Sequence, residues 1–337
     1  MVLQLNYTCP NRLLAIESVL CSLYLVHGKK SFLKMEISAN PQIKAIANPV
    51  FADASNKYTI SAEQKKFYDD HGFLVIKGLF EFDTLYNYKR HFIQMCNGVV
   101  DRGNATLVKE AVLAKKGLTG EQVINKVQEI HYDDVFMTYT EHPRLLHVLS
   151  QFIGDNITVV NSMFINKPPG SGQHPPHQDL FYFPFRPADK IIASWTAVDD
   201  VTKENGCLYV IPGSHKKNIL YPHGHTQGAN KLYHGILDES VYDTSKFSHL
   251  EMSPGDTVFF HPLIVHGSGP NVTKAYRKSI TAHYANSSCY YIDVKNSVQE
   301  PVAKEVEAEA KRRGFELSFQ DTWRFKSKQV LGVRSSL

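Results

Sequence analysis

The feature that most limits how this chain can fold is a series of short apolar runs after residue 157, separated by proline, glycine and asparagine. The runs are rich in β-branched and aromatic residues, a composition typical of strands. They read ITVVNSMFIN, IIASWTAV, CLYVIP, HLEMS, TVFFHP and KSITAHYA. Many short strands joined by turns predict a sandwich or barrel, and we expect this β core to span about residues 157–285.

Helical patterns flank the β-rich region. Ser61 and Gln64 have the spacing of a capping box, Gly72 is placed to end the helix that follows, and a strand is expected over 73–79. Further helices are expected in FDTLYNYKRHFIQMC, with Asp83 as its cap, and in TGEQVINKVQEI, TEHPRLLHVLSQFIG and VAKEVEAEAKRRG. The predicted fold class is therefore mainly β with flanking helices, in one domain over residues 57–337.

Residues 1–56 show no sustained periodicity and are expected to form a targeting or poorly ordered segment. Their apolar run, Leu13 to Val26, contains Glu17 and is shorter than the roughly 20 residues that cross a bilayer, so no membrane span is predicted. The net charge of +4 comes from dispersed lysines and arginines, which argues against a nucleic-acid partner. Five widely spaced cysteines without a C-x-x-C motif favour a reducing compartment.

The stretch HPPHQDLFYF contains a candidate metal-binding pair. His177 and Asp179 are two residues apart, so in an extended strand their side chains point to the same face. One imidazole and one carboxylate can then share a ligand sphere. An isolated H-x-D triplet also arises by chance in polar loops, so the pair needs further ligands to indicate a metal site.

Candidates for a third ligand follow in GDTVFFHPLIVHGSG, which contains His261 and His266. An antiparallel sandwich brings distant strands side by side, so either histidine can complete a two-histidine, one-carboxylate iron(II) site with open positions for a co-substrate and O₂. Arg277 lies shortly beyond, at the start of an expected strand. Its planar guanidinium suits the distal carboxylate of 2-oxoglutarate.

Over about residues 60–323, the chain resembles the phytanoyl-CoA dioxygenase family of Fe(II)/2-oxoglutarate oxygenases. The resemblance rests on FYDDHGFLVIKGL, KVQE, MFINKPPGSG, HPPHQDLFYFPFRP, WTAVDD, NGCLYVIPGSHK, GDTVFFHPLIVHGSG, YRK and YIDVK. It implies a double-stranded β-helix of the jelly-roll or cupin type. It further implies 2-hydroxylation of a 3-methyl-branched acyl-CoA in fatty acid alpha-oxidation, with Fe(II), 2-oxoglutarate and O₂, and with ascorbate as reductant.

The resemblance also assigns site residues. The implied iron ligands are His177, Asp179 and His266, and Arg277 is implied to hold 2-oxoglutarate. Three more residues are implied to line the co-substrate pocket, namely Lys126, Met163 and Trp195. Without the resemblance, Met163 and Trp195 read as core residues and Lys126 as a solvated charge on a helix. His261 is expected to pack in the wall, and His174, His215 and His283 to form hydrogen bonds in strands or loops, with His215 a weaker candidate for contacting the acyl-CoA.

Alternatives concern substrate and location. A related oxygenase could act on another acyl-CoA or small molecule, whereas a non-catalytic acyl-CoA-binding or metal-binding relative is disfavoured by the intact ligand set. The family's peroxisomal member carries an R-L-x₅-H-L signal, but RLLAIESVL has Val19 in place of the histidine. Ser335-Ser336-Leu337 is a weak relative of the serine–lysine–leucine address. We expect a peroxisomal location with an import receptor as partner, with the cytosol or mitochondria as alternatives.

Overall fold

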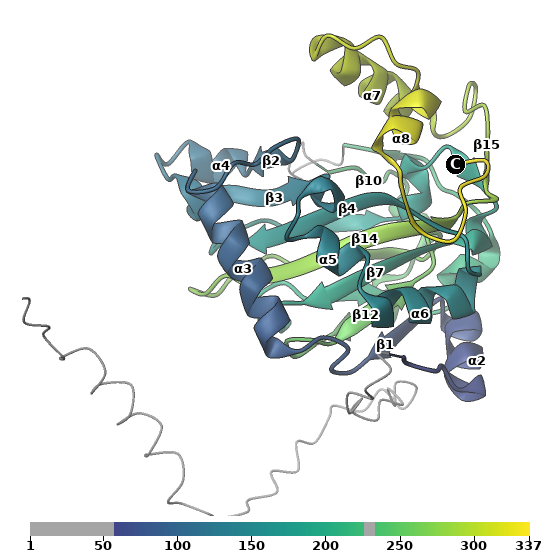
Figure 1. The fold of residues 1–337 in the computed structure, drawn as a ribbon, viewed down its shortest axis with the longest axis horizontal. Coiled ribbons are helices and arrows are strands. Elements are labelled where there is room, and N and C mark those ends of the chain that lie inside the picture. Colours follow the sequence, from purple (N-terminus) through teal and green to yellow (C-terminus); the bar gives the residue numbers. More distant parts are fainter. Residues whose placement is uncertain (1–56, 226–232) are drawn as a thin grey trace, which may run out of the picture. The chain divides into compact units, whose positions relative to one another are not determined.

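The computed structural model describes residues 57–225 and 233–337, so the expected targeting segment 1–56 lies outside the described residues. The largest element is an eight-stranded antiparallel sheet with strand order β1-β12-β7-β14-β4-β3-β2, in which β16 also pairs with β4 (Figure 1). Its strands are β1 (Phe73–Ile76), β2 (Thr106–Lys109), β3 (Ile124–Gln128), β4 (Ile157–Lys167), β7 (Ile191–Ala197), β12 (Thr257–Phe260), β14 (Arg277–Asn286) and β16 (Lys328–Leu331).

A smaller four-stranded sheet has the order β11-β8-β13-β5. Its strands are β11 (Ser248–Leu250), β8 (Leu208–Val210), β13 (His266–Ser268) and β5 (His174–His177). Two short pairs accompany it, β9 (His223–Gly224) with β10 (Gly235–Ile236), and β6 (Phe185–Arg186) with β15 (Tyr290–Tyr291). One buried cluster contains side chains of both the eight-stranded and the four-stranded sheet. It includes Trp195 and Val258 from the former and Val210 and Leu250 from the latter. The two sheets therefore enclose a common interior, and the predicted jelly-roll core is confirmed.

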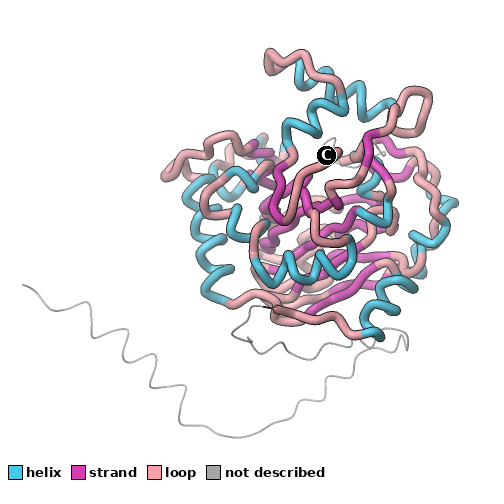
Figure 2. Tube along the Cα trace, turned by 45° about the vertical axis from the view of Figure 1, so that its right-hand side comes forward, coloured by secondary structure: helices cyan, strands magenta, loops and turns pink. Residues whose placement is uncertain are grey.

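Several helices cover the face of the large sheet that is turned away from the small sheet, as Figure 2 shows in cyan beside the strands in magenta. The helices are α2 (Ala62–His71), α3 (Phe82–Cys96), α4 (Ala111–Ala114), α5 (Met137–Thr140), α6 (Pro143–Ile153), α7 (Glu300–Arg312) and α8 (Phe319–Lys326). Single 3₁₀ turns are η1 (Gly120–Gln122), η2 (Ile130–Tyr132), η3 (Asp179–Tyr182), η4 (Ala188–Lys190), η5 (Ser214–Lys217), η6 (Glu239–Val241) and η7 (Thr244–Lys246).

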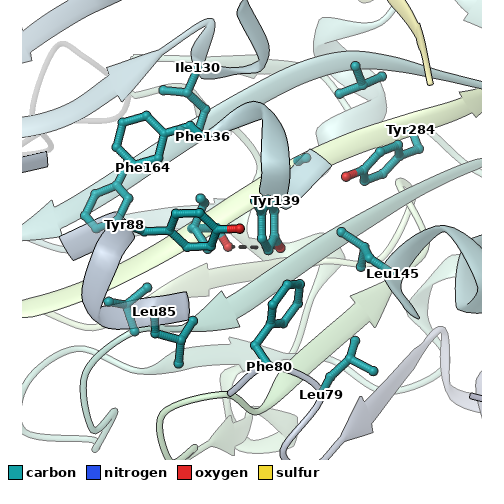
Figure 3. Close-up of a cluster of buried hydrophobic side chains, with 14 of the residues drawn as sticks. Leu79, Phe80, Leu85, Tyr88, Ile130, Phe136, Tyr139, Leu145, Phe164 and Tyr284 are labelled. Atoms are coloured by element: carbon teal, nitrogen blue, oxygen red, sulfur yellow. Dashed lines mark hydrogen bonds between the residues drawn. The ribbon is translucent and has the colours of Figure 1, made fainter. Parts of the chain in front are cut away.

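The packing of α3, α5 and α6 against the sheet follows from their apolar spacing. In α3 the buried residues Leu85, Tyr88, Phe92 and Met95 are three or four positions apart, which places them on one face. Figure 3 shows Tyr88 beside Tyr139, and Leu85 and Phe164 of β4 belong to the same buried cluster. This layer buries the outer face of the large sheet and leaves its inner face for the jelly-roll interior.

The predicted capping box and the predicted end of the first described helix are confirmed. The amide of Gln64 donates to Ser61 Oγ over 3.2 Å, and the amide of Ser61 donates to Gln64 Oε1 over 2.9 Å, which completes the capping box. Gly72 ends α2 with φ of 81°, a left-handed conformation that favours glycine. A Cβ at Gly72 would also lie 2.5 Å from the ring of His215, so close packing excludes larger residues there.

Two local predictions are wrong. TGEQVINKVQEI does not form a helix: only residues 120–122 make a 3₁₀ turn, and Ile124–Gln128 is strand β3, paired with both β2 and β4. The β-branched residues and the free edge of β4 outweigh the weak helical periodicity. The N-cap of α3 is Glu81. Asp83 lies in the first turn, where its negative charge interacts favourably with the positive end of the helix dipole. In the described part of the chain, no helix is both long and apolar enough to cross a membrane.

Candidate active site

The predicted ligand residues converge at one end of the small sheet. His177 ends β5, Asp179 opens the turn that follows it, and His266 starts β13. The antiparallel pairing of β13 with β5 sets His266 directly opposite His177. Asp179 Oδ1 lies 3.5 Å from His177 Nε2 and 3.7 Å from His266 Nε2. The structure therefore brings the three predicted side chains together from segments far apart in the sequence.

The geometry of these three side chains fits a metal ion. Two ligand atoms about 2.1 Å from one ion, at tetrahedral or octahedral angles, lie roughly 3.0–3.4 Å apart, close to the observed separations. His177 Nδ1 donates to Pro175 O over 2.9 Å, and His266 Nδ1 donates to Ile264 O over 3.1 Å. These bonds leave both Nε2 atoms free to bind a metal and fix the orientation of the rings. The donor set suits Fe(II) with open coordination positions.

The carboxylate of Asp179 is held in its charged form although it is only 6% exposed. Burial alone would raise its pKa, but the nearby His266 and His283, with hydrogen bonds from His177 and His283, hold the pKa well below its usual range. Asp179 Oδ2 accepts a hydrogen bond of 2.9 Å from His283 Nε2. This contact occupies one carboxylate oxygen and leaves Oδ1 to face the two ligand histidines.

The role of His283 was missed in the sequence, where it was expected only to form a hydrogen bond within a strand. A usable signal was present, because side chains two apart along a strand share a face. His283 and Arg277 are separated by an even number of positions in β14, so both face the interior. The position of β14 relative to the segment that carries Asp179 was needed to identify Asp179 as the partner of His283.

Arg277 begins β14 and is 1% exposed. Its Nη2 donates to Gly206 O over 2.9 Å, its Nη1 donates to Ser279 Oγ over 3.0 Å, and its guanidinium lies 5.4 Å from the centre of the Trp195 ring. Burial lowers the pKa of Arg277 to about 10, so the group remains cationic at neutral pH. Its buried Nε has no hydrogen-bond partner among the described residues, which suits a bound carboxylate.

The three residues assigned by resemblance lie on the same interior face. Thr281 of β14 pairs with Met163 on one side and with Trp195 on the other, and Lys126 pairs with Ile165. Directly paired residues point to the same face of a sheet, so all three share the face of Arg277. Lys126 therefore extends from a strand into the interior and is not a solvated charge on a helix.

Lys126 contacts an aromatic residue that the sequence reading missed. Its Nζ lies 5.5 Å from the centre of the Tyr233 ring, and burial lowers the pKa of Lys126 to about 8. Tyr233 in turn stacks on His174 at 4.2 Å, and His174 stacks on His177 at 3.9 Å. A continuous row of side chains thus leads from the ligand histidine to Lys126. No pattern in the sequence around Tyr233 indicated this contact.

Lys167 was also missed as a site residue, although MFINKPPGSG contains it. It pairs directly with Arg277 and is 4% exposed. Its Nζ donates to Gly172 O over 2.6 Å and to Gly269 O. Burial, followed by the charge of Arg277, places the pKa of Lys167 well below its ordinary value. Lys167 therefore connects the loops that contain Gly172 and Gly269, next to Arg277.

His261 lies apart from the ligand group, as expected for a wall residue. Its Nδ1 accepts from the amide of Leu263 over 3.1 Å, and its ring lies 5.2 Å from that of His215. His215 Nε2 donates to Asp69 O over 3.2 Å, at the end of α2. The choice of His266 over His261 agrees with this arrangement.

A jelly-roll core that encloses two histidines, one carboxylate and a buried arginine defines an enzyme class, the iron(II)- and 2-oxoglutarate-dependent oxygenases. The model of the phytanoyl-CoA dioxygenase (PhyH) family matches residues 68–279. The peroxisomal phytanoyl-CoA dioxygenase of Rattus norvegicus is 42% identical over 321 residues, covering 90% of this chain and 94% of the relative. The human protein of that name is 40% identical over 318 residues, covering 89% and 93%. The chain therefore belongs to the phytanoyl-CoA dioxygenase family.

Solved structures support the fold. EctD from S. alaskensis, crystallised with 2-oxoglutarate and 5-hydroxyectoine, gives a TM-score of 0.55 at 19% identity, covering 78% of this chain and 88% of EctD. EvdO2 from Micromonospora carbonacea var. aurantiaca, complexed with 2-oxoglutarate, gives 0.51 at 19% identity, covering 70% and 94%. At such low identity these likenesses show the shared architecture alone.

Proposed function

We propose that this chain hydroxylates carbon 2 of a 3-methyl-branched, phytanoyl-type acyl-CoA. In this proposal His177, Asp179 and His266 hold Fe(II), and Arg277 holds 2-oxoglutarate. Bound iron(II) supplies the oxidative chemistry: one atom of O₂ enters succinate as 2-oxoglutarate loses CO₂, and the other enters the C2–H bond. Ascorbate serves to keep the metal reduced.

One observation carries the proposal: three potential ligand atoms lie within 4.8 Å of one another on the same interior that Arg277 faces. The substrate is inferred from relatives that are 40–42% identical and are named phytanoyl-CoA dioxygenase. Because the same ligands serve many substrates in such folds, the substrate depends on the pocket walls and is tested separately.

The chain's own residues orient the reactants and exclude water. Arg277, stacked near Trp195, offers its unpaired Nε–H to the distal carboxylate of 2-oxoglutarate. Lys126 and Met163 border the same space and limit its volume. His283 holds one oxygen of Asp179, so that the carboxylate presents a single oxygen to the metal. Burial of Arg277, Asp179 and His283 strengthens their electrostatic contacts.

The test is succinate formation by the purified chain with Fe(II), ascorbate and 2-oxoglutarate, over a panel of branched and straight acyl-CoAs. We expect hydroxylated product in step with succinate for 3-methyl-branched substrates. Succinate without acyl product would leave the iron chemistry in place and overturn the substrate. The absence of succinate with every substrate would favour the non-catalytic alternative.

We also propose a peroxisomal location, supported by the relatives named as peroxisomal. The segment 335–337 is a weak candidate address, because the Leu337 side chain is 2% exposed. The amides of Ser336 and Leu337 both donate to Ser287 O, over 2.8 and 3.3 Å. An import receptor would have to displace these contacts to bind the tripeptide.

A further inference from the structure

A second cluster of histidines and a carboxylate lies outside the candidate active site. His225 directly follows β9, His234 directly precedes β10, and Glu305 lies on α7. Each offers one ligand atom, and these atoms lie within 4.8 Å of one another. Figure 1 shows α7 and β10 on the same upper side of the described structure. Residues from three segments thus converge on one point.

The separations suit a small ion held by nitrogen and oxygen. Glu305 Oε2 lies 3.0 Å from His234 Nε2, and Glu305 Oε1 lies 3.9 Å from His225 Nε2. Two ligands of a tetrahedral zinc ion lie about 3.3 Å apart, between these values. The rings of His225 and His234 stack with their centres 4.6 Å apart, and the Nε2 atoms of both rings face the Glu305 carboxylate.

Hydrogen bonding at His234 supplies an independent observation. This residue is 9% exposed, and its buried Nε2 makes no hydrogen bond to any described residue although Glu305 Oε2 is 3.0 Å away. The carboxylate is therefore near the ring nitrogen without the direction that a hydrogen bond requires. Its other nitrogen, Nδ1, lies 3.4 Å from the Tyr182 hydroxyl, and His225 Nδ1 lies 3.4 Å from Tyr233 O. Outer partners of this kind orient histidines that bind metal through Nε2.

We propose that His225, His234 and Glu305 form a second metal site, which binds a divalent ion of the zinc type with water in the fourth position. Two imidazoles and one carboxylate favour zinc over magnesium or calcium, which prefer oxygen ligands. The bound ion joins the β9–β10 pair to α7. It thereby restrains Tyr233, the neighbour of His234, against His174 at the candidate active site.

The experiment measures zinc binding to the full chain, free of any affinity tag and stripped of metal. Two histidines and a carboxylate are also zinc ligands, so zinc is expected to enter the candidate iron site as well. The background is therefore Asp179→Ala, with His177→Ala as a second background in case the first fails to fold. We expect one equivalent of zinc in either background. Adding Glu305→Gln or His225→Ala should weaken this binding at least tenfold, because each removes a ligand. Both side chains are about half exposed, so neither change should unfold the chain.

Glu309→Gln is the matched control, because Glu309 lies on the same helix and pairs with arginines at the surface. It should leave zinc binding unchanged. Cobalt provides a second measurement: a tetrahedral site gives intense visible absorption that Glu305→Gln should abolish. The proposal is overturned if the Asp179→Ala and His177→Ala proteins bind no zinc. It is equally overturned if zinc uptake and cobalt absorption are the same with Glu305→Gln as with Glu309→Gln.

Discussion

His283 donates from Nε2 to Asp179 Oδ2 over 2.9 Å, and the second ring nitrogen of His283 is buried without a partner among the described residues. The contact therefore fixes which oxygen of Asp179 faces the ligand histidines. It links β14, the central strand that also carries Arg277, to the turn after β5. His283 thus connects the strand that carries Arg277 to the turn that carries Asp179.

Replacing His283 with alanine should lower Fe(II) affinity about 10–100-fold, because the carboxylate loses the partner that orients it. His283→Gln, which can still donate to Asp179, should recover part of the loss. Iron titration of both variants measures the effect, with His249→Ala on the exposed edge of β11 as control. Equal iron affinity in His283→Ala and the unmodified chain would contradict the positioning role.

Alanine at His177, Asp179 or His266 should reduce 2-oxoglutarate turnover to background, because each change removes one of three ligands. His261→Ala should retain iron and turnover, since the His261 ring packs against His215 and not against the ligand group. Succinate formation and bound iron, measured on the same samples, test the assignment. Loss of iron in His261→Ala together with its retention in His266→Ala would reverse the third ligand.

Some residues of this site could be predicted from the sequence and others could not, for physical reasons. His177, Asp179 and Arg277 were identified because spacing and side-chain chemistry are local properties of the chain. Lys126 was placed on a helix because its segment has mixed periodicity, and only the free edge of β4 makes it a strand.

The partnerships of His283 and Tyr233 depend on register between strands and on a contact across the interior. No local sequence pattern indicates either partnership. The jelly-roll class was predictable for the opposite reason, since a run of short β-branched segments has few ways to bury its apolar face.

Arg277→Lys should raise the KM for 2-oxoglutarate about 10–100-fold and change the acyl-CoA KM far less. A lysine cannot reproduce the planar guanidinium, which donates to Gly206 and Ser279 through its two Nη atoms and keeps its Nε–H without a partner among the described residues. Steady-state kinetics with each substrate varied in turn separates the two constants. An unchanged 2-oxoglutarate KM would assign the carboxylate to another cation, with Lys126 the first to examine.

The pH dependence of 2-oxoglutarate binding should reflect Lys126. Burial lowers its pKa to about 8, so its positive charge is present below that pH and is lost as the pH rises through it. The KM for 2-oxoglutarate should therefore increase between pH 7 and pH 9. Lys126→Arg keeps its charge over this range and should show a flatter profile. Parallel profiles for the two proteins would mean that Lys126 does not contribute charge to the pocket.

The buried position of Leu337 leads to a prediction about targeting and stability together. Its side chain packs in the cluster that contains Trp323 and Phe183 and is 2% exposed. Leu337→Ala should therefore lower the free energy of unfolding by about 2–5 kcal/mol, measured by urea denaturation. Since the folded chain conceals this residue, a reporter fused after Leu337 should leave peroxisomal delivery intact. Delivery that survives only the fusion ahead of Met1 would show that segment 335–337 is read after all, and that its contacts with Ser287 open for the receptor.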